Sequence, residues 1–247
     1  MNSAEIAVAR QETANAAEGG PLYIEEIHNV GTLGLRVGNW GLIGYGQYNA
    51  NIVSCEYPLG SKVQYFHGGQ LWIGGIIGQD TLVSMAGEET RADEGAAGDF
   101  IRRSTIRSNA YYSPEALSEQ DLICTYTDTS MWYARYDHFD NRPHIPLNVS
   151  IRQSSYAWSY AYASDFVLFD FHITNIGAGT ISRMFIGVNI WGQPYVYGYD
   201  ANYENGLCGF RRTAPAQDRT CLAEDSINVA WVADVDGNAN SEGEWDN

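Results

Sequence analysis

The stretch QSSYAWSYAYASDFVLFDFHITNIG, residues 153–177, decides the expected fold. In residues 155–164, the even positions up to 162 are aromatic, and the odd positions are serine or alanine. Strict alternation predicts a β-strand with one aromatic face and one small-residue face. The aromatic face carries Tyr156, Trp158, Tyr160 and Tyr162.

Two more strands are expected directly after this one. Residues 166–173 alternate as well, residues 174–180 form a turn rich in Asn and Gly, and residues 181–191 are expected to return beside the first of these strands. Long strands joined by such turns predict an all-β fold, an antiparallel β-sandwich of the jelly-roll or immunoglobulin-like kind. The apolar side of residues 166–173 carries Val167, Phe169, Phe171 and Ile173.

The rest of the chain agrees with a sheet protein. The apolar runs 71–77 and 81–85 are separated by Gly78-Gln79-Asp80, which predicts a β-hairpin. Glycine at about every third position in residues 27–50 predicts tight turns or bulges. Residues 113–119 predict a short helical turn with Ser113 as N-cap, followed by a strand at 123–126.

Composition narrows the classes of function. The 247 residues carry a formal net charge of −16 and a single lysine. Such a surface repels phosphates and anionic lipid, so nucleic-acid and membrane-surface partners are not expected. No apolar run approaches the roughly 20 residues of a membrane-spanning helix.

The first residues are expected to form an N-terminal arm, residues 1–21, ahead of a β-sandwich domain, residues 22–247. The start MNSAEIAVARQ lacks the basic and apolar regions of a signal peptide. Ala4, Ile6 and Val8 alternate, so they lie on one side of an extended strand that needs a partner for its backbone groups. We expect this strand to join a sheet edge of a neighbouring copy, or to fold back on its own domain.

The four cysteines of the chain give information on the redox environment of the protein. Cys208 and Cys221 flank one polar loop, which predicts a disulfide between them and an oxidising environment. Two buried thiols are the alternative. Cys55 and Cys124 carry no prediction.

Four stretches of the chain carry a resemblance to known proteins. They are SCEYPLGS (54–61), LWIGGIIGQDTLVS (71–84), YSPEALSEQDLICTYTDT (112–129) and QSSYAWSYAYASDFVLFDFHITNIG (153–177). Together they resemble the N-terminal regions of large secreted proteins of bacteria that use type IX secretion. The resemblance implies an extracellular, β-rich surface protein and supplies no catalytic residues. Those proteins are usually much longer than this chain, so we expect the chain to be a fragment, the N-terminal part, of a longer polypeptide.

Oxygen-bearing side chains alternate around Gly237 near the end of the chain. Calcium takes six to eight oxygen ligands, and loops of this composition supply them. Calcium is therefore the expected cofactor, and a solvated acidic turn is the alternative. The ligands would be Asp234, Asp236, Asn238, Asn240 and Glu242.

The aromatic face of residues 155–164 has three interpretations. It is one face of a packed sandwich, a protein interface, or a platform on which sugar rings stack. Neighbouring acidic pairs such as Glu25-Glu26 point to opposite faces of a strand, and no hydrolase or nucleotide-binding motif occurs. No catalytic residues are therefore assigned.

These observations predict an extracellular or cell-surface structural or interaction protein, a subunit of an extracellular fibre or surface assembly that self-associates or binds other surface proteins. A carbohydrate-binding module with glycan partners is the first alternative. A secreted glycoside hydrolase is the second.

Overall fold

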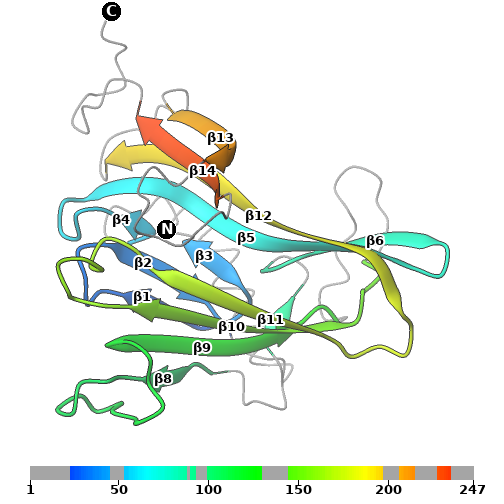
Figure 1. Cartoon of the computed structure of the whole chain (residues 1–247), viewed down its shortest axis with the longest axis horizontal. Coiled ribbons are helices and arrows are strands. Elements are labelled where there is room, and N and C mark those ends of the chain that lie inside the picture. The colour runs from blue at the N-terminus through cyan, green and yellow to red at the C-terminus, as the bar shows by residue number, and fades with distance from the viewer. Residues whose placement is uncertain are drawn as a thin grey trace, which may run out of the picture.

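The computed structural model describes residues 23–44, 53–87, 90–92, 99–129, 144–196, 206–214 and 227–234. Within these residues every regular element is a β-strand, and all strand pairs are antiparallel (Figure 1). The predicted all-β, antiparallel fold is therefore confirmed. No helix of the described part is long and apolar enough to cross a bilayer.

The larger sheet has seven strands. Its main order is β1-β2-β3-β5-β12, with β4 pairing to β2 and β5, and β6 pairing to β5. The predicted hairpin is the β5–β6 pair, which turns at Gly78. The bounds are β1 (Glu25–His28), β2 (Gly34–Gly38), β3 (Leu42–Gly44), β4 (Cys55–Glu56), β5 (Val63–Ile77), β6 (Asp80–Met85) and β12 (Ile181–Val196).

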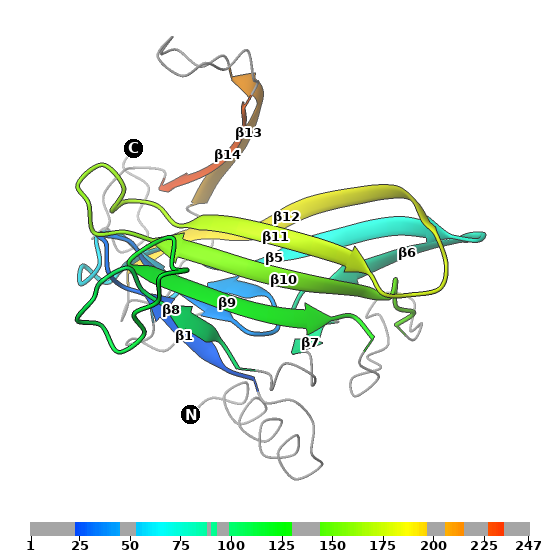
Figure 2. The same cartoon turned by 60° about the horizontal axis from the view of Figure 1, so that its bottom comes forward.

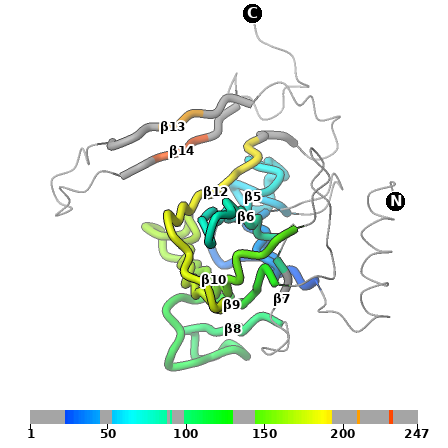
Figure 3. Tube along the Cα trace, turned by 90° about the vertical axis from the view of Figure 1, so that its right-hand side faces the viewer, coloured from blue at the N-terminus to red at the C-terminus, as the bar shows by residue number. Residues whose placement is uncertain are grey.

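The second sheet has five strands in the order β11-β10-β9-β7, with β8 pairing to β9. A separate two-stranded sheet, β13–β14, lies beside the end of β12 and away from β8 and β9 (Figure 3). The bounds are β7 (Arg91–Ala92), β8 (Ile101–Arg103), β9 (Gln120–Thr127), β10 (Val149–Ala157), β11 (Leu168–Asn175), β13 (Gly206–Ala214) and β14 (Ile227–Asp234).

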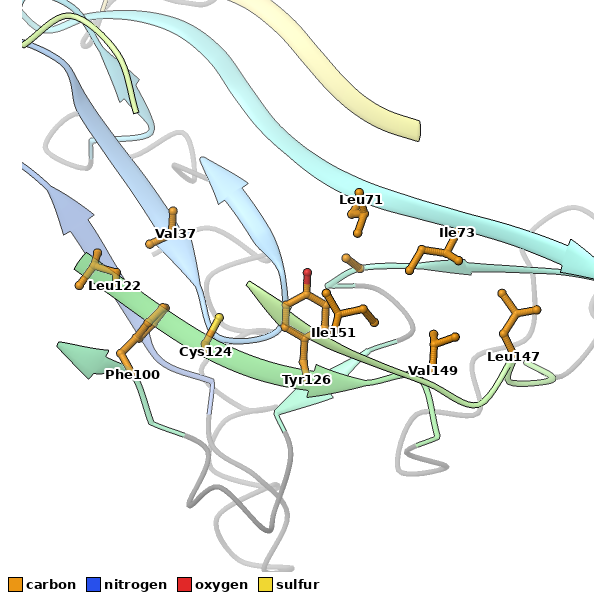
Figure 4. Packing of buried hydrophobic residues seen from close by; sticks show 11 residues of the cluster. Val37, Leu71, Ile73, Phe100, Leu122, Cys124, Tyr126, Leu147, Val149 and Ile151 are labelled. Atoms are coloured by element: carbon orange, nitrogen blue, oxygen red, sulfur yellow. The ribbon is translucent and has the colours of Figure 1, made fainter. Parts of the chain in front are cut away.

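The two large sheets face each other across an apolar core that consists of two clusters of buried residues (Figure 2). Leu71 and Ile73 of β5 lie opposite Val149 and Ile151 of β10, and the Tyr126 side chain of β9 is fully buried between them (Figure 4). Alternate residues of each strand point inward, so this layered arrangement follows from the period-two pattern.

Glycines of residues 27–50 occupy tight positions, as their spacing predicts. Gly41 has φ +94, and a Cβ there would lie 2.6 Å from the Tyr126 ring. A Cβ on Gly31 would lie 2.4 Å from the Ser164 carbonyl oxygen. The first position needs a residue that tolerates positive φ, and the second lets two loops approach each other.

Three sequence expectations are wrong. The first expected strand does not run to residue 164, because β10 ends at Ala157. Residues 113–119 form no helix: the Ser113 hydroxyl accepts from the Glu115 N–H, but the segment only turns. Residues 181–191 do not return beside β11, because β12 crosses to the other sheet and pairs with β5.

Candidate functional site

Two sheet edges are open on the same side of the sandwich. β11 ends one sheet and β12 ends the other, and no described strand pairs with the outer edge of either. Residues 176–180 connect these two strands, so the edges lie close together (Figure 2). An unpaired edge presents backbone N–H and C=O groups that another strand can use.

Between Ile186 and Ile190, the inner face of β12 is apolar and about half exposed. Ile186 pairs with Ile73, and Val188 pairs with Leu71, so their side chains point to the same face of the sheet. Leu71 and Ile73 are each 2% exposed, whereas Ile186 and Val188 are 58% and 56% exposed. Ile190, two residues further on, is 45% exposed. The core therefore continues onto β12 but is not closed there.

A β-bulge sets this inward orientation. Ile181 and Ile186 are five residues apart, but their partners Ile77 and Ile73 are only four residues apart. The extra residue on β12 resets the alternation, so both isoleucines face inward. Arg183 lies within the bulge and has φ 50.

Residues 185–191 of β12 lack the devices that normally protect a sheet edge. The sequence FIGVNIW contains no charged residue and no proline, and its pairing with β5 is regular. Natural edge strands usually carry lysine, proline, bulges or inward charges that block pairing with other chains. No described strand pairs with its outer edge, so the backbone groups of this stretch are open to a further strand.

Strand β11 forms the opposite wall. Its inner side chains Phe169, Phe171 and Ile173 are partly buried against the core, and the two phenylalanine rings stack 5.9 Å apart. A pocket of about 430 Å³ lies where residues 176–180 join the two strands, and its lining includes Ile173, Ile181 and Met184. We call the apolar surface between β11 and residues 185–191 of β12 the open edge.

Comparison with protein-family models, curated proteins and solved structures finds no match to this chain. The resemblance to type IX secretion proteins therefore stays a prediction, and the open edge is interpreted from its own chemistry.

The predicted aromatic ladder is divided between two elements. Tyr156 lies on β10, whereas Trp158, Tyr160 and Tyr162 lie in the loop before β11. Trp158 packs near Phe166, with ring centroids 6.1 Å apart. The exposed rings of Tyr160 and Tyr162 stack on each other at 5.5 Å, so the four residues do not form one flat row.

Other predicted sites lie mostly outside the described residues. These are the arm residues Ala4, Ile6 and Val8, the cysteine Cys221, and the calcium ligands Asp236, Asn238, Asn240 and Glu242. Cys208 and Asp234 belong to β13 and β14, but their side chains are not described. In the described part, no three His, Cys, Asp or Glu side chains cluster as metal ligands do. The disulfide and calcium stay predictions.

The most deeply buried carboxylates hold loops. Asp121 accepts hydrogen bonds from the backbone of Leu117 and Ser118 at 2.8 Å each. Asp128 accepts from the Leu147 and Val149 N–H groups at 2.6 and 2.8 Å. Both carboxylates also accept a hydrogen bond from a serine hydroxyl, Ser118 for Asp121 and Ser84 for Asp128.

Sequence reasoning missed the residues of the open edge. Ile186, Val188 and Ile190 were assigned to a strand, yet their exposure depends on the sheet that the strand joins. One signal was available: residues 185–191 are an uncharged apolar run, whereas residues 166–173 carry Asp170.

Proposed function

We propose that this chain is a structural subunit of an extracellular or cell-surface assembly, and that it joins its partners by accepting a β-strand at the open edge. The observation that carries the proposal is the exposure of Ile186 and Val188, whose partners on β5 are buried. A strand added beside β12 would extend the sheet and cover these side chains at once.

The free energy gained by covering the open edge can be compared with the cost of association. Complete burial of an aliphatic side chain contributes about 1.5–3 kcal/mol. Ile186, Val188 and Ile190 are each about half exposed, so covering them would contribute on the order of 3 kcal/mol. Association also costs translational and rotational freedom. Backbone hydrogen bonds along residues 185–191 would have to supply the remainder, which favours a strand over a small ligand.

The test is the substitution Val188→Glu, with Val83→Glu as its matched control. Val83 is 49% exposed, lies on β6 in the same sheet, and is also a valine on a strand. Both variants add one negative charge, but only Val188 faces the open edge. We expect Val188→Glu to abolish assembly in analytical ultracentrifugation, and Val83→Glu to assemble like the unmodified chain. Equal assembly of all three proteins would refute the proposal.

Carbohydrate binding is a second candidate, favoured by an exposed surface on the outer face of the same sheet. Trp72 and Phe185 are exposed there, opposite Gly187 and Gly74 respectively. A Cβ at Gly187 would have no neighbour within 4 Å, so the space at this glycine, opposite Trp72, is open. Flat aromatic faces next to glycine suit sugar stacking. Glycan-array binding that is lost in Trp72→Ala, but kept in Tyr162→Ala, would support it.

A further inference from the structure

The open edge has dimensions that a particular stretch of this chain matches. Residues 185–191 offer seven paired positions with inward side chains at every second residue. Residues 4–9, AEIAVA, place Ala4, Ile6 and Val8 at the same spacing. Both segments are about 20 Å long when extended, so three small apolar side chains would lie beside three half-exposed aliphatic ones.

Four other segments outside the described residues suit the open edge less well. Residues 93–98 and 235–247 are acidic and rich in glycine or asparagine, and residues 215–226 carry four charges and a proline. Residues 130–143 combine bulky aromatics with five charged or histidine side chains. Residues 4–9 are an aliphatic alternation with a single charge, Glu5, which is on the opposite side from Ile6.

The topology of the larger sheet indicates how the donor and acceptor copies would be arranged. The described chain begins just before β1, and β1 and β12 end opposite sides of the same sheet. A donor that leaves at one edge and an acceptor at the other make a head-to-tail contact. Repetition of such a contact builds an open chain instead of a closed pair.

We propose that residues 4–9 of one copy add as a strand to β12 of the next copy, with Ile6 and Val8 covering the open edge. This inference rests on the proposed function and names the occupant of its acceptor. The same contact, repeated from copy to copy, would generate a fibre.

The experiment uses the full chain and the matched pair Ile6→Asp and Ala7→Asp. The two variants carry the same added charge one residue apart, but only Ile6 faces the acceptor. We expect Ile6→Asp to weaken association at least about tenfold in analytical ultracentrifugation, and Ala7→Asp to change it less than about twofold. A mixture of Ile6→Asp, which keeps its acceptor, and Val188→Glu, which keeps its donor, should form one-to-one dimers and nothing longer.

The outcomes separate the two proposals. If Val188→Glu disrupts assembly and Ile6→Asp does not, another segment occupies the open edge, so the inference is wrong while the proposed function stands. If Val188→Glu assembles normally, the proposed function fails. If each variant alone is monomeric and their mixture gives no dimers, donation between copies is refuted. A full chain that stays monomeric at tens of micromolar refutes both.

Discussion

A histidine links the two sheets in the buried interior. His28 of β1 has no exposed surface, and its Nε2 lies 2.7 Å from the Ser155 hydroxyl of β10. Burial lowers the pKa of His28 from 6.5 to about 4, because the charged ring would lose its hydration. The ring is therefore neutral at pH 7 and acts as a polar connection inside the core.

This shift predicts an acid-dependent loss of stability. The unfolded chain binds a proton at His28 below about pH 6.5, whereas the folded chain resists protonation until about pH 4. Stability that is complete above pH 6.5 should therefore fall by about 3 kcal/mol as the pH drops to 4. Urea unfolding at several pH values should show this loss in the unmodified chain. The loss should be smaller in His28→Gln, and parallel curves for the two proteins would contradict the assignment.

The two buried cysteines should be inert. Cys55 and Cys124 are free, and burial raises the pKa of each thiol to about 12. Because the thiolate is the reactive form, iodoacetamide at pH 8 should leave both unmodified in the folded protein and label both in guanidinium. Labelling of Cys124 in the folded protein would contradict its burial.

A separate prediction concerns the disulfide between Cys208 and Cys221. Peptide mass mapping without reductant should find these two cysteines joined.

At the scale of elements, Asp128 fastens the segment that enters β10. Its carboxylate accepts hydrogen bonds from the Ser84 hydroxyl of β6 at 2.6 Å, and from the Leu147 and Val149 N–H groups. Asp128→Ala would leave three buried donors without an acceptor, so we expect a loss of about 3 kcal/mol of unfolding free energy.

Asp170→Ala is the control for this prediction, because Asp170 is exposed on β11 and its loss removes the same charge. Its unfolding free energy should change by less than about 0.5 kcal/mol in guanidinium melts. Equal stability of the two variants would show that Asp128 is not a fastening point.

Several strands and the β5–β6 hairpin were predictable from the sequence, but the partner of β12 was not. The alternation in residues 166–173 correctly indicated the apolar face of β11, since Phe169, Phe171 and Ile173 contact the core. The same kind of alternation misled after Ala157. There the chain leaves the sheet, and the Ser164 carbonyl accepts hydrogen bonds from the Thr32 and Leu33 N–H groups of a distant loop. Local alternation cannot report such a tertiary contact.

The candidate site depended even more on tertiary pairing. Residues 181–191 have the composition of a return strand, and nothing local indicates that β5 pairs with them in place of β11. The bulge at Arg183 adds one residue, so the inward set changes from odd to even positions along β12. A sequence pattern with a fixed period misses this change, and with it the apolar surface that faces the open edge.

At the scale of the whole molecule, two forces on association oppose each other. A net charge of −16 makes copies repel, whereas the proposed strand addition at the open edge would hold copies together through apolar and backbone contacts. The repulsion would slow the approach of copies. The attraction would act only once a strand has reached β12.

This balance predicts that salt strengthens assembly. The Debye length falls from roughly 20 Å at about 20 mM NaCl to roughly 4 Å at about 0.5 M, so repulsion between copies is largely screened while apolar burial is not weakened. We expect the dissociation constant between copies, measured by sedimentation equilibrium, to fall by about tenfold over this range. Val188→Glu should remain monomeric at both salt concentrations, because screening cannot replace the lost apolar contact. If salt instead dissociated the assembly, ion pairs would be holding the copies together, and an uncharged edge such as FIGVNIW could not be the contact.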